Sequence, residues 1–163
     1  MRNKSSKIVS RAGLASISRR MARQGRRLVF TNGCFDLIHP GHVRLLQQAR
    51  RMGDALAVAI NSDASVRRLK GPGRPILDAR ERAEVLSAFE CVDYVVVFSE
   101  PTPAAIVRAV RPGVLVKGGD WSPERIVGRD TVTAGGGEVR VVPLRRGLST
   151  SALLKRILAG RRQ

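Results

Sequence analysis

Two histidines, His39 and His42, lie three residues apart where a predicted strand leads into a predicted helix. Such a pair could bind a metal, act as a catalytic acid and base, hold an anion, or simply begin a helix. Zinc sites need three or four ligands with supporting groups. The chain has no third histidine, and Cys34 is the only obvious further ligand nearby. We therefore expect no metal held by protein side chains here.

The position at a helix start favours anion binding, with a structural alternative left open. Backbone N–H groups and the positive end of the helix dipole attract an anion at such a place. Two imidazoles on the first turn would add donors, and Gly41 would let a phosphate approach the backbone. In the alternative, Pro40 sets the backbone and His39 only caps the helix.

A second helix start of this kind is predicted at Ser149-Thr150-Ser151, where hydroxyl donors follow the cation of Arg145. Its alternative is an ordinary helix cap with exposed arginines. If both starts lie at one sheet edge, they could hold a triphosphate from two sides.

The elements that position these residues alternate along the chain. Nearly continuous apolar runs predict buried strands, and apolar residues at helical spacing predict helices between them. The expected strands are 28–31, 55–60, 94–98, 114–116 and 138–142, and the expected helices between and after them are 42–52, 78–89, 103–110 and 149–158. We expect a basic loop at 67–75 and an irregular stretch before 138. The alternation predicts an α/β fold, a Rossmann-like doubly wound parallel sheet of about five strands in three α/β/α layers.

Polar residues follow three of the predicted strands, at 31–36, 61–63 and 117–120. Ligands of open α/β sheets bind at the carboxyl edge of the strands. The site is therefore expected at that edge.

Length and composition suit one domain with its own core: 163 residues, of which 43% are hydrophobic. Residues 1–10 are expected to form a flexible basic tail, and 11–163 a single domain that begins with an amphipathic helix carrying Leu14, Ile17 and Met21. Two cysteines without framework spacing indicate a reducing compartment. No apolar run approaches the ~20 residues of a membrane span.

The formal net charge of +17 is the most unusual feature of the composition. It could reflect nucleic-acid binding, a solvated arginine-rich surface, or a site for small polyanionic substrates. Aromatic residues make up only 4% of the chain, which leaves few platforms for stacking bases. We therefore expect no nucleic-acid partner, while a basic nucleic-acid-binding module stays the alternative from a different functional class.

An ordered set of motifs resembles one enzyme family. These motifs are Thr31–Asp36, His39-x-Gly41-His42, Asn61–Ser65, Arg68–Gly71, Arg74-Pro75, Val92-Asp93, Val116–Asp120 and Ser149-Thr150. Together they are similar to the cytidylyltransferase-like nucleotidyltransferases with the H-x-G-H signature, and more closely to those that act as heptose 1-phosphate adenylyltransferases. The resemblance covers about residues 12–158.

The resemblance implies a reaction. A phosphate oxygen of D-glycero-β-D-manno-heptose 1-phosphate attacks the α-phosphate of ATP in line, and pyrophosphate leaves as ADP-heptose forms for the lipopolysaccharide core. Mg²⁺ is expected, held mainly by the nucleotide phosphates, and catalysis rests on positioning and charge stabilisation. The resemblance further implies a cytoplasmic bacterial enzyme without a membrane partner, a separate sugar kinase that supplies the acceptor, and a tendency of relatives to pair as homodimers.

The same resemblance assigns roles to residues. The catalytic groups would be His39, His42 and Thr150. The nucleotide would be bound by Thr31, Asn32, Gly33, Cys34, Phe35, Gly41, Lys70, Arg145, Ser149, Thr150 and Ser151. The acceptor would be bound by Asp36, Asn61, Arg82, Lys117, Gly119, Asp120 and Trp121.

Two positions depart from the pattern of the heptose enzymes. Ser151 stands where threonine is commoner, which keeps the hydroxyl, and Trp121 stands where they usually carry tyrosine. Glycerol-3-phosphate cytidylyltransferases have Asp-Trp at that place. A cytidylyltransferase acting on glycerol 3-phosphate or another small phosphorylated alcohol is therefore the second interpretation.

Overall fold

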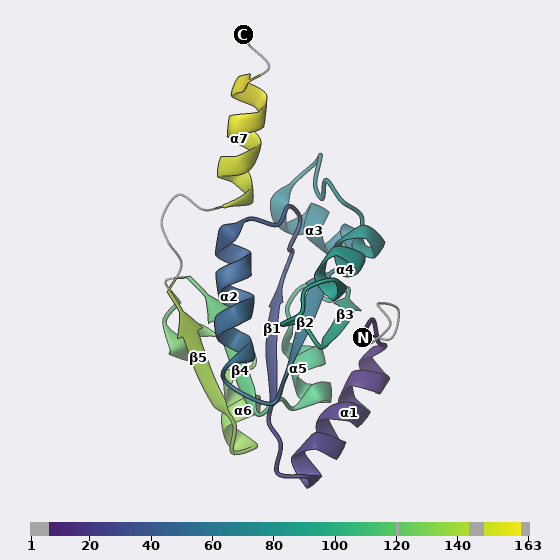
Figure 1. The fold of residues 1–163 in the computed structure, drawn as a ribbon, viewed down its shortest axis with the longest axis vertical. Helices are drawn as coiled ribbons and strands as arrows, with labels where there is room; N and C mark the ends of the chain where they lie inside the picture. Colours follow the sequence, from purple (N-terminus) through teal and green to yellow (C-terminus); the bar gives the residue numbers. More distant parts are fainter. Residues whose placement is uncertain (1–6, 120, 144–148, 161–163) are drawn as a thin grey trace.

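The computed structural model describes residues 7–119, 121–143 and 149–160 (Figure 1). Its centre is a five-stranded sheet in the order β3-β2-β1-β4-β5, and every neighbouring pair is parallel. The strands are β1 (Leu28–Gly33), β2 (Ala55–Asn61), β3 (Tyr94–Phe98), β4 (Val114–Gly118) and β5 (Glu138–Val142). Strand order therefore reverses between β1 and β4, where a crevice opens at the carboxyl ends.

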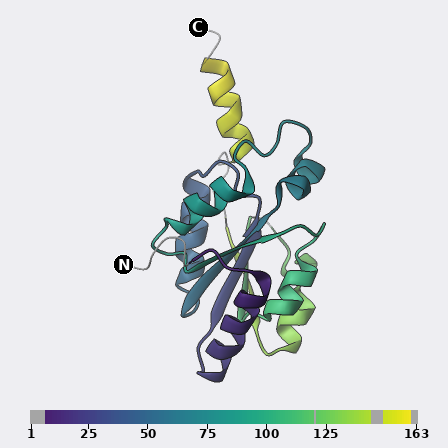
Figure 2. The ribbon, with the colours of Figure 1, turned by 90° about the vertical axis from the view of Figure 1, so that its right-hand side faces the viewer.

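Helices cover both faces of the sheet. In chain order the helices are α1 (Arg11–Arg23), α2 (Pro40–Arg50), α3 (Asp63–Lys70), α4 (Ala79–Ser87), α5 (Ala104–Val110), the 3₁₀ turn η2 (Pro123–Arg125), α6 (Arg129–Ala134) and α7 (Thr150–Gly160). Helix α7 covers neither face, since it projects beyond the carboxyl ends of the strands (Figure 1). Figure 2 shows the sheet from the side, with α2 and α4 on one face and α1, α5 and α6 on the other. The predicted doubly wound three-layer fold is confirmed.

The period-two alternation of the strands divides the core between the two faces. Leu28 and Phe30 pack into the cluster under α1, α5 and α6, while Val29 packs into the cluster under α2 and α4. Strand β2 is buried at all seven positions because it lies between β1 and β3 with helices on both sides. This burial explains its continuous apolar sequence.

Three helical segments stand where the sequence predicts a loop and an irregular stretch. Helix α3 reaches Lys70, into the predicted loop at 67–75, and η2 with α6 fills much of the stretch before 138. Val66 is the single apolar side chain that α3 buries, and Val132 the single one of α6. One buried position gives no helical periodicity, so the pattern could not predict these helices.

Part of the predicted flexible tail is paired with the sheet, because residues 7–9 lie along the edge strand β3. Val9 N–H donates to the carbonyl of Val95 at 2.9 Å, and Val95 N–H donates to that of Lys7 at 2.8 Å. The unpaired backbone of an edge strand offers these bonds to any neighbouring extended segment. Among the helices of the described ranges, none is both long and apolar enough to cross a bilayer.

Candidate active site

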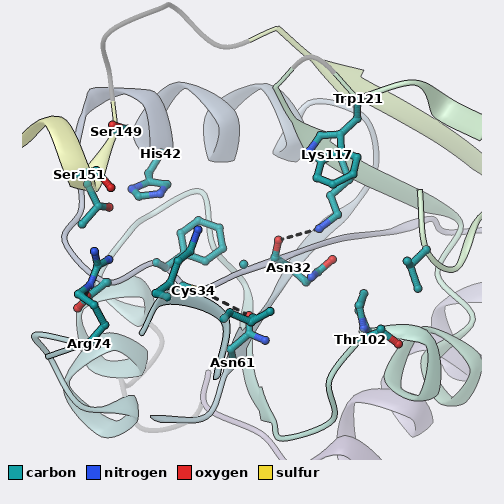
Figure 3. Close-up of a pocket in the computed structure, with 18 of the residues that line it drawn as sticks. Asn32, Cys34, His42, Asn61, Arg74, Thr102, Lys117, Trp121, Ser149 and Ser151 are labelled. Carbon is teal, nitrogen blue, oxygen red and sulfur yellow. Dashed lines mark hydrogen bonds and ion pairs between the residues drawn. The ribbon is translucent and has the colours of Figure 1, made fainter. Parts of the chain in front are cut away.

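A cavity of about 590 Å³ opens at the carboxyl ends of the strands, around the point where the strand order reverses (Figure 3). Many residues that the sequence singled out line it together, although they come from separate segments. They are Asn32, Gly33, Cys34, Phe35, Asp36, His39, His42, Asn61, Lys70, Lys117, Trp121, Ser149, Thr150 and Ser151.

His39 caps helix α2, so the structural alternative is correct for one of its two ring nitrogens. Its Nδ1 accepts a hydrogen bond from Gly41 N–H at 3.1 Å. Because a neutral imidazole that accepts at Nδ1 carries its proton on Nε2, the second nitrogen is a donor. Burial lowers the pKa of His39, which favours this neutral form. Capping and anion binding are therefore compatible.

His42 lies one turn further on, stacked against His39 with ring centroids 3.8 Å apart. Burial first, and the neighbouring His39 second, lower the pKa of His42 to about 4. Its Nδ1 is buried and has no hydrogen-bond partner among the described residues. A bound phosphate would supply the negative charge that this buried ring lacks, and would raise its pKa.

The floor of the cavity is formed by the ends of β1, β2 and β4. Lys117 Nζ donates to the carbonyl of Asn32 at 3.4 Å, and the Cys34 thiol lies 3.8 Å from Asn61 Oδ1. Burial lowers the pKa of Lys117 to about 8, opposed by the nearby Cys34. Burial also raises the pKa of the Cys34 thiol. A phosphate anion near Lys117 would hold its charge in place.

Asp36 lines the cavity, but its carboxylate oxygens are used by the protein. They accept from Arg74 Nε at 2.7 Å, Ile76 N–H at 2.9 Å and Leu77 N–H at 3.0 Å. Burial alone would raise the pKa of Asp36, and these bonds outweigh it, so the pKa is lowered. Its predicted contact with the acceptor stays a prediction, while the observed bonds give it a positioning role.

Arg82 does not line the cavity, in contrast to its predicted place beside the acceptor. It is 1% exposed, and its guanidinium donates to the carbonyls of Leu77 at 3.0 Å, Cys34 at 2.7 Å and Asn61 at 2.8 Å. It also pairs with Asp63 at 2.6 Å. Each of the three guanidinium nitrogens thus donates to the protein, so Arg82 joins the ends of β1 and β2 and does not reach the cavity.

Three small residues of the prediction, Thr31, Gly41 and Gly119, lie outside the cavity lining. Thr31 is 0% exposed within β1, and its hydroxyl has no partner among the described residues. Gly41 is buried in the first turn of α2, and Gly119 N–H donates to the carbonyl of Val142 at 3.0 Å. Asp120 and Arg145 lie outside the described residues.

The start of α7 faces the cavity from the side of His42 (Figure 3). Ser149 Oγ accepts from Ala152 N–H at 3.1 Å, and the Thr150 hydroxyl donates to the carbonyl of Leu37 at 3.4 Å. The ordinary cap is therefore present, as the structural alternative predicts. Ser151 lines the same side of the cavity, and its predicted phosphate contact stays a prediction.

Several lining residues carry no role in the sequence prediction: Leu69, Arg74, Pro101, Thr102, Pro103, Arg125, Ile126 and Val127. The segment of Thr102 directly follows β3, so the rule on carboxyl ends could have found it. Arg74 belongs to the predicted basic loop, but its type alone does not show that it faces inward. Ile126 and Val127 carry no chemical signal.

Comparisons with known proteins place this geometry in context. Residues 30–146 match the family model described as cytidylyltransferase-like. The "Bifunctional protein HldE" of Syntrophotalea carbinolica is 52% identical over 153 residues, which are 94% of this chain and 31% of that protein. The protein of the same name from Nitrobacter hamburgensis is 59% identical over 133 residues, 82% of this chain and 27% of that protein. The chain thus spans about a third of the length of these curated relatives.

Two solved structures share the fold. The lipopolysaccharide core biosynthesis protein of Thermoplasma volcanium has a TM-score of 0.61 and 27% identity, covering 74% of this chain and 98% of that one. Pantoate-beta-alanine ligase of Francisella tularensis also has a TM-score of 0.61, at 15% identity, covering 91% of this chain and 72% of that one. The second likeness concerns the fold alone.

Proposed function

Because the chain belongs to the cytidylyltransferase-like family, we propose that it transfers AMP from ATP to D-glycero-β-D-manno-heptose 1-phosphate. The products are ADP-heptose and pyrophosphate. The observation that carries this proposal is the charge of the cavity. Among the described residues four cations line it, Lys70, Arg74, Lys117 and Arg125, against one carboxylate, Asp36, which is already bonded to the protein. Such a cavity suits two phosphorylated substrates that together carry several negative charges.

The choice of acceptor rests on the motifs and on the relatives. The ordered motifs resemble heptose 1-phosphate adenylyltransferases, and a solved structure with the same fold is named a lipopolysaccharide core biosynthesis protein. The relatives are named bifunctional and are about three times as long as this chain. In our proposal a separate sugar kinase supplies the sugar 1-phosphate, and the reaction takes place in the bacterial cytoplasm, where ATP is available.

In the proposed reaction an oxygen of the sugar phosphate attacks the α-phosphorus, and the bond to the bridging oxygen of the β-phosphate breaks. The electron pair leaves with pyrophosphate, and no covalent enzyme intermediate forms. His39 Nε2–H and the His42 ring would donate to phosphate oxygens where this charge develops. The hydroxyls at the start of α7 would hold the outer phosphates. Lys117 and Asn61, on the floor of the cavity, would orient the acceptor.

The donor set fits a Mg²⁺ ion held mainly by the nucleotide. The oxygens of Asp36, the one carboxylate in the described lining, accept bonds from protein donors. No cluster of three or more His, Cys, Asp or Glu side chains occurs in the described ranges. Mg²⁺ commonly binds through substrate phosphates and water with few protein ligands. When bound, it would neutralise charge on the phosphates.

The experiment is a pyrophosphate-release assay with ATP or CTP and with heptose 1-phosphate or glycerol 3-phosphate. We expect the fastest turnover with ATP and heptose 1-phosphate. Preference for CTP and glycerol 3-phosphate would instead support the second interpretation, which Trp121 in the cavity wall favours. No turnover with any pair, together with tight salt-sensitive binding to DNA or RNA, would overturn the enzyme proposal.

A further inference from the structure

Arg74 lies in the segment between α3 and α4; it belongs to the motif set of the resemblance, which assigned it no role. Its side chain is 14% exposed and lines the cavity. In the view of Figure 3 its guanidinium points toward the side of the cavity where Ser151, Ser149 and His42 lie, away from Thr102 and Trp121. Arg74 therefore faces the part of the cavity where the two helix starts meet.

One edge of the Arg74 guanidinium is fixed by a buried carboxylate. Nε donates to Asp36 Oδ2 at 2.7 Å, and the Asp36 side chain is 1% exposed. The Asp36 oxygens also receive the N–H groups of Ile76 and Leu77, so the loop and the carboxylate hold each other. The side chain is thereby ordered before any ligand arrives, which lowers the entropy lost on binding.

The other edge of the guanidinium is available. Within the described ranges the terminal nitrogens of Arg74 make no hydrogen bond, whereas Nε is fully used. A guanidinium keeps its charge when partly buried, and its terminal N–H groups match two phosphate oxygens at once. Lys70, the last residue of α3, also lines the cavity but offers only a point charge on a flexible stem.

We propose that Arg74 is a further catalytic residue, whose terminal nitrogens bind the β- and γ-phosphates and stabilise the negative charge that leaves with pyrophosphate. Asp36 is its positioning residue. This inference rests on the proposed nucleotidyl transfer. Arg74 would balance the departing negative charge opposite His42 and the hydroxyls of α7. Asp36 uses its oxygens to accept bonds from protein donors because it holds Arg74 and its loop in place.

The test measures binding of inorganic pyrophosphate, ATP and AMP to the full chain by titration calorimetry. Variants are Arg74→Lys, Arg74→Gln and Asp36→Asn, with Arg80→Lys as the control, since Arg80 is an exposed arginine on the neighbouring helix α4. We expect Arg74→Lys to weaken pyrophosphate and ATP by about tenfold, the worth of one lost charge-assisted bidentate contact. The affinity for pyrophosphate and ATP should fall further in Arg74→Gln, fall less in Asp36→Asn, and stay unchanged in Arg80→Lys.

AMP separates the proposed role from a general defect, because AMP lacks the outer phosphates and should bind all four variants like the parent chain. Equal pyrophosphate affinity in Arg74→Lys, Arg74→Gln and the parent would overturn the inference, and so would an equal loss for AMP. Binding of pyrophosphate needs no acceptor and no turnover. If the parent chain turns over no substrate pair, but Arg74→Gln still weakens pyrophosphate binding, the proposed function is refuted and the inference about Arg74 stands.

Discussion

Replacing Arg82 with methionine separates the role predicted from the sequence from the role seen in the structure. The sequence places Arg82 beside the acceptor phosphate, whereas the structure buries it with its donors on the carbonyls of Leu77, Cys34 and Asn61 and on the carboxylate of Asp63. Methionine fills much of the same space without a charge. The two roles then predict different losses.

The magnitude follows from the groups left behind. A buried acceptor without a donor costs about 1–3 kcal/mol. The Asn61 bond is fully buried, whereas Asp63 keeps 31% of its side chain exposed and regains water. We therefore expect a loss of about 4 kcal/mol in the free energy of unfolding, within the ~3–5 kcal/mol seen when one partner of a buried pair is removed. At a urea slope of about 2 kcal/mol/M, the midpoint falls by about 2 M.

The assay is urea unfolding of the parent chain, Arg82→Met, Arg82→Lys and the exposed control Arg80→Met on the same helix. Arg82→Lys keeps the charge near Asp63 but cannot serve all the acceptors, so it should lose about half as much. A midpoint for Arg82→Met equal to that of Arg80→Met, together with a raised KM for the acceptor alone, would refute the structural reasoning and restore the phosphate contact.

Three further predictions concern charge and the N-terminus. Lys117→Met should raise the free energy of unfolding at pH 7 by about 1–3 kcal/mol. The pKa of Lys117 is lowered from 10.5 to about 8, so the unfolded chain binds more protons between these two pH values. Urea unfolding should therefore show that the advantage of the variant disappears as pH rises from 8 to 10.5. His42→Ala should reduce turnover by about 10²-fold or more with an unchanged circular dichroism spectrum. In the parent chain, ATP should raise the pKa of His42 from about 4, measured by NMR; an unchanged pKa would contradict a phosphate contact. Deleting residues 1–10 removes the pairing with Val95 and the Ser10 cap, so it should cost about 1–3 kcal/mol in urea while turnover at 25 °C stays unchanged; a lost activity in the folded variant would place the segment in the site.

The positions of the strands along the chain could be predicted from the sequence, because a strand buried on two faces has a nearly continuous apolar sequence. Strand β3 begins at Tyr94 and β5 ends at Val142 as predicted, and β1, β2 and β4 extend by a few polar residues beyond their apolar runs. Those extensions, such as Asn61 and Gly118, form the edge of the cavity. Helices α3 and α6 were not predictable, because each buries a single apolar residue.

The site was predictable as a set of segments and less so as a set of contacts. The rule that ligands bind at the carboxyl edge brought Cys34, Asn61 and Lys117 together correctly. Residue type could not show which charged side chains make their hydrogen bonds to other protein groups. That depends on the fold of the segment between α3 and α4, which carries too few apolar residues to leave a pattern.

Two guanidinium–carboxylate pairs in this region, Arg74–Asp36 and Arg82–Asp63, look alike as residue types but differ in what they leave free. Arg82 donates to four protein acceptors and does not line the cavity, so it contributes to stability by joining the strand ends. Arg74 gives Nε alone and keeps its terminal nitrogens toward the cavity, in the described part of the chain. Free donors beside a cavity, and not charge or burial as such, therefore distinguish a ligand-binding arginine from a structural one. Because Leu77 bonds to both Asp36 and Arg82, the two pairs hold neighbouring parts of one segment, and loss of Arg82 should also loosen the grip of Arg74 on pyrophosphate.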